Sequence, residues 1–276
     1  MLARLSILTC SRIIAGLLPA HLSHLPAPSA DALAASERLS RVIAREIAAA
    51  QGWLPFDRYM DLALHAPGLG YYSAGARKFG PAGDFVTAPG LGALFARTLA
   101  REIARLVEAG LDTILELGAG DGALAHQLLS ELARLDRMPR EYLILETSAD
   151  LKERQAALLH PARSSWTTRV GWLASLPARI DGIVLANEVL DAMPVRLVET
   201  GDGTVDELGV SGVHSFAWAR RPADRALAAH VESLALPAGY RTEVHTSPLG
   251  FVRTLGKRLT RGVALFIDYG FPAHEY

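Results

Sequence analysis

The sequence has little cysteine, no excess of charge of either sign and no histidines at metal-binding spacing. Its 276 residues include one cysteine, Cys10, which cannot form an internal disulfide or a cysteine-rich metal site. The 28 Lys and Arg residues against 29 Asp and Glu residues give a net charge of -1. A surface that neutralises a phosphate backbone needs a basic excess. We therefore expect no nucleic-acid partner and no metal ion.

Long apolar runs are also scarce. The most apolar early stretch, residues 2–18, is interrupted by Arg4 and Arg12, whereas a membrane-spanning helix needs about 20 predominantly apolar residues. Residues 1–30 contain no acid and are rich in alanine and proline towards their end. This composition predicts a disordered tail, with a presequence as the alternative, and no membrane span.

What is present is a pattern typical of an α/β protein. Hydrophobic residues make up 50% of the chain and charged residues 21%, as in ordinary soluble globular domains. After residue 110, short apolar strands alternate with amphipathic helices. The expected strands are residues 113–117, 142–146, 169–173, 182–186 and 262–270, and the expected helices are residues 121–135 and 148–159. Such alternation predicts a parallel sheet with helices on both faces.

The rest of the chain has a different texture. Residues 31–110 contain three expected helices, at 31–51, from Pro55 onwards, and at 90–109, where Leu91 and Leu94 begin an apolar stripe. The glycine-rich residues 68–84 between them are either a mobile cover over a ligand or a rigid loop. Residues 195–220 resemble antiparallel hairpins inserted into the parallel sheet. We therefore expect a tail at 1–30, a helical cap at 31–110 and a core at 111–276.

The clearest local motif joins the strand at 113–117 to the next helix. Gly118, Ala119, Gly120 and Gly122 form a G-x-G-x-G turn whose backbone can approach a ligand closely. Glu116 precedes it, and a carboxylate there suits a cationic ligand, such as the amino and sulfonium groups of S-adenosylmethionine, better than a pyrophosphate. The alternative is a tight turn without a ligand, because such short patterns recur by chance.

A second acid follows the next strand. Glu146, with Thr147 after it, lies 30 residues beyond Glu116. At that position a carboxylate can accept hydrogen bonds from both ribose hydroxyls of an adenosine. The alternative is an ordinary solvent-exposed acid. The combination of a glycine turn with a strand-end acid one βα unit later favours a nucleoside-containing cofactor.

A third cluster, Asn187, Glu188 and Asp191, follows the strand at 182–186. These side chains are expected at the carboxyl end of the sheet, near the glycine turn. The two carboxylates could hold a guanidinium through paired hydrogen bonds. They could also act as general bases, bind a metal, or only cap a helix.

The motifs together resemble those of the MidA-like methyltransferases, over residues 54–276. The shared segments are 56–73, Gly83–Pro89 with the sequence GDFVTAP, 116–122, 145–148, 186–195 and 267–270. Each segment is short, but six in the right order are specific. One departure is Gly90, where the family usually has an acidic residue.

The resemblance implies a Rossmann-like class I methyltransferase fold and S-adenosyl-L-methionine as cofactor. It implies methyl transfer to an arginine of a protein, since eukaryotic mitochondrial members assist respiratory complex I assembly in this way. Gly83 and Asp84 would then contact the cofactor, and Asn187, Glu188 and Asp191 would serve catalysis. It also implies a protein substrate and a cytoplasmic location, or the mitochondrial matrix in a eukaryote, and it is compatible with a homodimer.

Other functions stay open on the sequence alone. One is a non-catalytic assembly or binding protein that keeps the nucleotide fold, because fold alone does not give function. Another is a methyltransferase that acts on a small molecule. The family's chains continue past the strand at 262–270, so we expect the C-terminal strands of the full sheet to be missing here.

Overall fold

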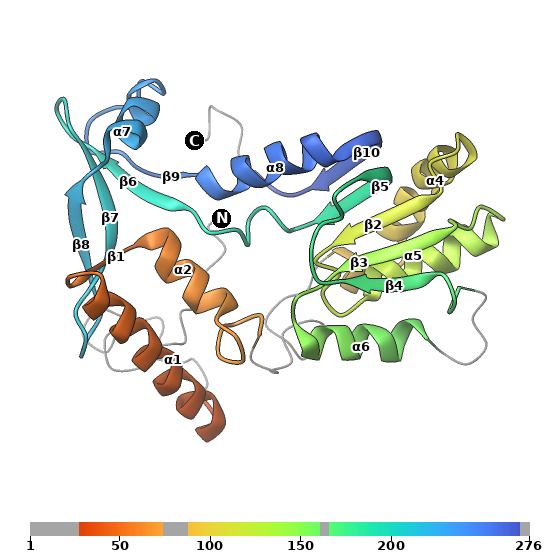
Figure 1. The fold of residues 1–276 in the computed structure, drawn as a ribbon, viewed down its shortest axis with the longest axis horizontal. Helices are drawn as coiled ribbons and strands as arrows, with labels where there is room; N and C mark the ends of the chain where they lie inside the picture. The colour runs from red at the N-terminus through yellow and green to blue at the C-terminus, as the bar shows by residue number, and fades with distance from the viewer. Residues whose placement is uncertain (1–27, 74–87, 161–165, 271–276) are drawn as a thin grey trace. The chain divides into compact units, whose positions relative to one another are not determined.

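The computed structural model describes residues 28–73, 88–160 and 166–270, which fold into two compact units (Figure 1). One unit comprises residues 75–193 and 250–276, and the other comprises residues 1–74 and 194–249. Neither unit is formed by one continuous segment. The sheet unit contains every expected methyltransferase motif that lies after residue 110.

The sheet unit is built on five parallel strands in the order β10-β5-β2-β3-β4. Their bounds are β2 (Thr113–Leu117), β3 (Glu141–Leu145), β4 (Val170–Leu173), β5 (Ile180–Asn187) and β10 (Leu259–Ile267). Numbered within the sheet alone, this order is 3-2-1-4-5, that of the doubly wound nucleotide-binding folds. The structure therefore confirms the predicted class of fold and places β2 at its centre.

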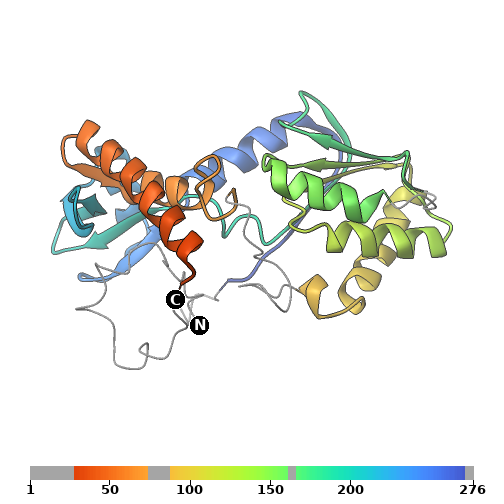
Figure 2. The ribbon, with the colours of Figure 1, turned by 90° about the horizontal axis from the view of Figure 1, so that it is seen from below.

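Helices cover both faces of this sheet, as the uniformly apolar strands predict. On one face lie α4 (Leu94–Glu108), α5 (Ala123–Arg134) and α6 (Ala149–Leu159) (Figure 2). On the other face, α8 (Thr246–Arg258) buries Leu255 against Leu115 and Val184. Both sides of β2 are thus withdrawn from water, and the exposed parts of the sheet are the two strand ends.

The helix expected at residues 90–109 is interrupted. The structure has a short α3 (Ala88–Leu91), then Gly92 with φ +150°, then α4 from Leu94. Leu91 and Leu94 were expected to face the core, but each is 79% exposed. The first buried residue of α4 is Ala96. The apolar periodicity of the sequence runs across Gly92, but the helix does not, because the backbone changes direction at this glycine.

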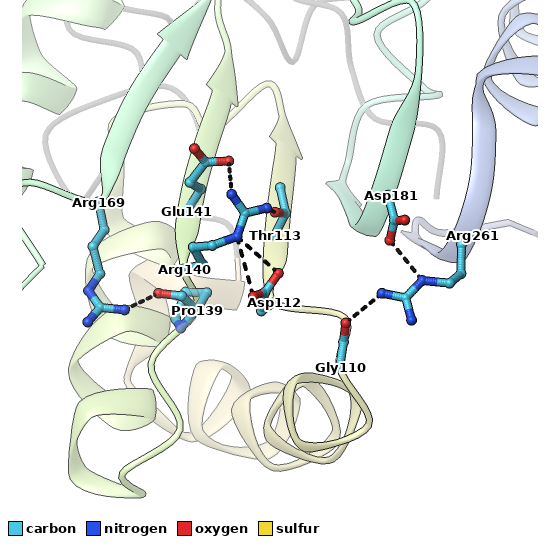
Figure 3. A network of polar contacts seen from close by, with 9 residues as sticks. All are labelled: Gly110, Asp112, Thr113, Pro139, Arg140, Glu141, Arg169, Asp181 and Arg261. Carbon is cyan, nitrogen blue, oxygen red and sulfur yellow. Dashed lines mark hydrogen bonds and ion pairs between the residues drawn. The ribbon is translucent and has the colours of Figure 1, made fainter.

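Arginine side chains form hydrogen bonds and ion pairs between the amino ends of the strands, at the sheet edge opposite the glycine turn (Figure 3). The Arg140 guanidinium donates to Asp112 at 3.3 Å and to Oγ1 of Thr113 at 2.9 Å. Arg261 donates to Asp181 at 3.0 Å and to the carbonyl of Gly110 at 2.8 Å. These groups are largely exposed, so each contact stabilises the fold only slightly.

The second unit combines the start of the chain with the insertion. Its five-stranded sheet contains β1 (Trp53–Pro55), β6 (Arg196–Thr200), β7 (Val205–Ser211), β8 (Ala217–Pro222) and β9 (Arg241–Val244), and all its pairs are antiparallel. Helices α1 (Ala30–Ala49) and α2 (Phe56–His65) share an apolar core with β7, and α7 (Arg225–Glu232) shares another with β6.

The insertion is therefore present, and it is larger than the hairpins expected at 195–220. The strand β1 was not expected at all. The division of the chain also differs from the expected boundary at residue 110, because α4 packs on the parallel sheet while α1 and α2 pack with the insertion. No local pattern in the sequence predicts this division, because β1 pairs with residues more than 150 positions away.

One acid lies in the core of the sheet unit. Glu116 of β2 is 2% exposed, and Tyr142 of β3, which is fully buried, donates a hydrogen bond to its Oε2 at 2.7 Å. Burial raises the pKa of Glu116 to about 7, against the smaller lowering effect of the tyrosine hydroxyl. A carboxyl group in such surroundings favours its neutral form.

Replacing this acid changes how stability depends on pH. The pKa of Glu116 is higher in the folded than in the unfolded chain, so its folded form holds a proton that the unfolded form releases as the pH rises above about 4.5. The parent therefore loses about 2–4 kcal/mol of unfolding free energy between pH 4.5 and 7 through this group. We expect Glu116→Gln to remove that loss in urea unfolding at several pH values. The exposed Glu153 is a control, because Glu153→Gln should leave the pH profile unchanged; an unchanged profile in Glu116→Gln would contradict the expectation.

Candidate functional site

Four chain segments meet at the carboxyl ends of the parallel strands. They are residues 118–122 after β2, 146–148 after β3, 188–193 after β5, and 268–270 after β10. The strand order reverses between β2 and β5, where the connections leave towards opposite faces. Open α/β sheets bind their ligands in the crevice at such a reversal. The fold thus brings the three predicted motifs to one edge.

The glycine turn has the backbone that its sequence predicts. Gly118, Gly120 and Gly122 have φ values of +62°, +57° and +86°, a region that side chains rarely adopt. A Cβ at Gly118 would lie 3.4 Å from Cγ2 of Val189, in the segment after β5. Ala119 is buried, and Gly122 precedes α5. The turn therefore presents backbone, with Gly118 exposed, at the reversal of the sheet.

Glu116 does not lie at this open edge. The sequence places it at the end of the strand, facing a cationic ligand, but the strand continues to Leu117 and the Glu116 side chain points into the helix-covered core towards Tyr142. The alternation of side chains along β2 decides this, since Glu116 shares its face with the buried Ile114. Its position is below the turn and not among the exposed groups.

Glu146 lies at the end of β3, half-buried, with its carboxylate held at both oxygens. Oε1 accepts from the backbone N–H of Ser148 at 2.8 Å, and Oε2 accepts from Nε2 of Gln155 at 3.1 Å. An ionised carboxylate has about four acceptor positions. Each oxygen therefore keeps room for one further donor. The neighbouring Thr147 is exposed.

Gln155 was not predicted as part of the site. It is fully buried on α6, and its amide contacts the carbonyl of Gly120 at 2.8 Å as well as Glu146. Its Oε1 accepts from the indole N–H of Trp172 at 2.8 Å. The available signal was a polar residue on an apolar helix face, because Leu151 and Leu159, four residues before and after it, are both buried.

The acidic cluster after β5 is partly as predicted. Asn187 and Glu188 are half-buried, and Asp191 is exposed. Glu188 has φ +52°, and its backbone N–H donates to the carbonyl of Ile267 at 2.8 Å, at the end of β10. Burial raises the pKa of Glu188, and the charges of Asp191 and Asp268 raise it further, against a hydrogen bond from Asn187.

Two residues after β10 complete this cluster, although no role was expected for either of them. Asp268 accepts from the backbone N–H groups of Leu190 and Asp191 at 3.0 and 3.4 Å. Tyr269, which is 60% exposed, donates its hydroxyl to Oδ2 of Asp191 at 2.6 Å. Desolvation and the Asp268 charge raise the pKa of Asp191, while this hydroxyl lowers it. The available signal was the position of Asp268 and Tyr269 at the carboxyl end of the expected strand 262–270.

Some expectations lie outside this geometry. Gly83 and Asp84 fall outside the described residues, so their contact with a cofactor stays a prediction. Within residues 28–73, 88–160 and 166–270, no group of three or more His, Cys, Asp and Glu side chains is arranged to hold a metal ion. None of the helices described there combines the length and apolar character of a membrane-spanning segment.

The chain is similar to known methyltransferases. Curated relatives are the mitochondrial protein arginine methyltransferase NDUFAF7 homologues of Caenorhabditis elegans and Drosophila melanogaster, each 28% identical. The matches cover 55% and 79% of this chain, and 41% and 57% of those proteins. The chain thus spans about half the length of the curated relatives it matches.

Solved structures give a closer likeness. A Burkholderia thailandensis protein with bound S-adenosyl-homocysteine is 48% identical, with a TM-score of 0.86, over 91% of this chain and 67% of that one. A native structure from the same organism has 48% identity and a TM-score of 0.82, over 91% and 66% of the two chains. A family profile described as an S-adenosyl-L-methionine-dependent methyltransferase matches residues 94–276. The chain therefore belongs to this family of S-adenosyl-L-methionine-dependent methyltransferases.

Proposed function

We propose that this protein transfers a methyl group from S-adenosyl-L-methionine to an arginine side chain of another protein. The observation that carries the proposal is the meeting of a positive-φ glycine turn, a strand-end carboxylate and an acidic cluster at one edge of the sheet. The family and the S-adenosyl-homocysteine bound to the 48% identical relative support the cofactor. The names of the curated relatives support the substrate class.

The residues at this edge fit the cofactor. The turn at 118–122 offers exposed backbone at Gly118 for its methionine portion, and the free acceptor positions of Glu146 match two ribose hydroxyls. Glu116 is buried in the core beside Tyr142, and we assign it no contact with the cofactor. When bound, S-adenosyl-L-methionine supplies a sulfonium methyl group that is open to attack by a nitrogen.

The acidic cluster fits a cationic substrate. Glu188, Asp191 and Asp268 lie close enough for their charges to raise the pKa of Glu188. A guanidinium placed among them would relieve that repulsion, and its planar donors match carboxylates in pairs. Glu188, with its raised pKa, is a better proton acceptor than an ordinary carboxylate when the attacking nitrogen must lose a proton. Tyr269 keeps Asp191 in position.

A protein fits this cluster better than a small metabolite. Asp191 is exposed and Tyr269 is 60% exposed, whereas small-molecule sites enclose most of their ligand. An arginine at the end of a long side chain could reach such an open position. The test is mass spectrometry of lysate proteins incubated with isotope-labelled S-adenosyl-L-methionine and this protein. Label on arginine supports the proposal, and label only on metabolites or on other side chains contradicts it.

Removing the charge of Glu188 should damage turnover much more than cofactor binding. We expect Glu188→Gln to lower methyl transfer at least about tenfold, because a cationic substrate is costly to desolvate without its carboxylate. Affinity for S-adenosyl-homocysteine should stay within a few-fold of the parent, the pattern of an interaction made with the substrate. Both are measured on one preparation, by methyl-transfer assay and calorimetry.

Glu141→Gln is the matched control for this experiment. Glu141 lies at the amino end of β3, paired with the exposed Arg140 at 3.4 Å, at the opposite edge of the sheet (Figure 3). It should keep full turnover. If Glu188→Gln also keeps full turnover and only melts at a lower temperature, Glu188 is a structural group and the arginine-binding role is wrong.

A branched side chain in the glycine turn should abolish cofactor binding. In Gly118→Val the valine would have to adopt a φ near +62°, which a branched residue rarely does. Its side chain would also crowd Val189, at the place where we propose that the backbone of the turn contacts the cofactor. Calorimetry with S-adenosyl-homocysteine should then detect no binding.

Gly203→Val separates this effect from backbone strain. Gly203 has φ +70°, but a Cβ there would meet nothing within 4 Å, and it lies in the other unit between β6 and β7. Both variants therefore carry a similar backbone penalty. We expect only the variant at Gly118 to lose binding; equal affinities in the two would remove the turn from the cofactor site.

A further inference from the structure

We propose that Gln155 is a positioning residue that fixes the ribose-binding carboxylate and the glycine turn to each other, and so determines the preference of the protein for a ribose-containing cofactor. The inference rests on the proposed function. It assigns a role to a fully buried amide on α6 that contacts no ligand itself. The juxtaposition that carries it is one side chain bonded to the segments after β2 and β3 at once.

The Gln155 amide uses both of its N–H donors on the site. Nε2 donates to the carbonyl of Gly120 at 2.8 Å and to Oε2 of Glu146 at 3.1 Å. A primary amide has two such donors, and here the two acceptors belong to different loops. A movement of either loop therefore breaks a hydrogen bond of the Gln155 amide, which is costly because this side chain is fully buried.

Trp172 determines which way this amide points. The indole N–H is a donor only, and it donates to Oε1 of Gln155 at 2.8 Å. The carboxylate and the carbonyl on the other side are acceptors only. If the amide were reversed, its N–H groups would face the indole N–H, and its oxygen would face the carboxylate and the carbonyl. The surroundings therefore allow only one orientation of the amide. Trp172 belongs to β4, and the network thus spans the ends of three adjacent strands and α6.

Packing adds a second constraint at the same place. A Cβ on Gly122 would lie 3.4 Å from Cγ and 3.5 Å from Cα of Gln155. The last glycine of the turn therefore packs against the helix residue that holds the Gly120 carbonyl and Glu146. Because the other Glu146 oxygen accepts from Ser148 at 2.8 Å, the carboxylate is held at two points while part of it stays accessible.

This arrangement predicts an effect on ribose recognition in particular. A carboxylate that is oriented in advance loses little freedom when it accepts two hydroxyl groups. Without Gln155 the carboxylate can rotate and bind other donors. The affinity for a cofactor with ribose hydroxyls should fall, whereas the affinity for one without them should not.

The test compares S-adenosyl-homocysteine with its 2′,3′-dideoxy analogue by calorimetry. We expect the parent to prefer the ribose compound about tenfold or more, as for hydrogen bonds to a charged acceptor. In Gln155→Met the dissociation constant for S-adenosyl-homocysteine should rise about tenfold, and that for the dideoxy analogue should change less than about twofold. The preference should then nearly vanish.

Two further variants keep the result interpretable. Trp172→Phe retains the ring but removes the donor that orients the amide, so it should reduce the preference in the same direction, even if Gln155→Met fails to fold. Gln127→Met makes the same change on α5, where the amide donates to the carbonyl of Pro89 at 3.0 Å and touches neither loop. It should leave the preference unchanged.

The outcomes separate this inference from the proposed function. Equal weakening of both compounds in Gln155→Met, or an unchanged preference in both site variants, means a merely structural residue and overturns the inference while cofactor binding stands. A parent that binds both compounds equally removes Glu146 as the ribose acceptor, and the inference with it. A parent that binds neither compound overturns the proposed cofactor itself, and everything that rests on it.

Discussion

The parallel pairing of β2 with both β3 and β5 is the constraint on which the site depends. Because the chain leaves β2 and β5 towards opposite faces of the sheet, the crevice at the carboxyl edge between these two strands is the place where such a fold binds its ligand. The turn at 118–122 and the acidic cluster at 187–191 come from these two neighbouring strands, and their register fixes the two segments side by side. The site is therefore a consequence of strand order, before any side chain is chosen.

The polar side chains near the site form two groups, one at the surface of the carboxyl edge and one buried beneath it. Groups on the surface of the edge, such as Glu188, Asp191 and Tyr269, face solvent at least in part, while Gln155 and Glu116 are buried beneath it. Buried polar groups stabilise a structure only when they are hydrogen-bonded. Here each of the two buried groups is bonded to a partner on another strand or loop. The same bonds that make burial tolerable also limit the movement of the exposed groups.

Much of the sheet unit could be predicted, because its signals are local. Apolar strands and amphipathic helices give their periods directly, and strand ends such as Glu146 follow from them. The role of Gln155 and the burial of Glu116 could not be predicted, since both depend on which neighbour a side chain meets across the sheet. The prediction that Leu91 and Leu94 face the core was wrong, because apolar periodicity alone does not reveal that the helix is interrupted at Gly92. The union of β1 with β7 lacked any local signal. The roles of Glu188 and Asp191 stay predictions.

The division of the second unit along the chain has a consequence during synthesis. Helices α1 and α2 leave the ribosome early, yet Leu39, Ile43 and Leu62 share their core with Val210 of β7. About 150 residues separate α2 from that strand, and at roughly 5–20 residues per second their translation takes about 10–30 s. For that time an apolar helix pair lacks its native partner, while the sheet strands β2 to β5 emerge after it. The native core around α1 and α2 is therefore completed only after the insertion has been made.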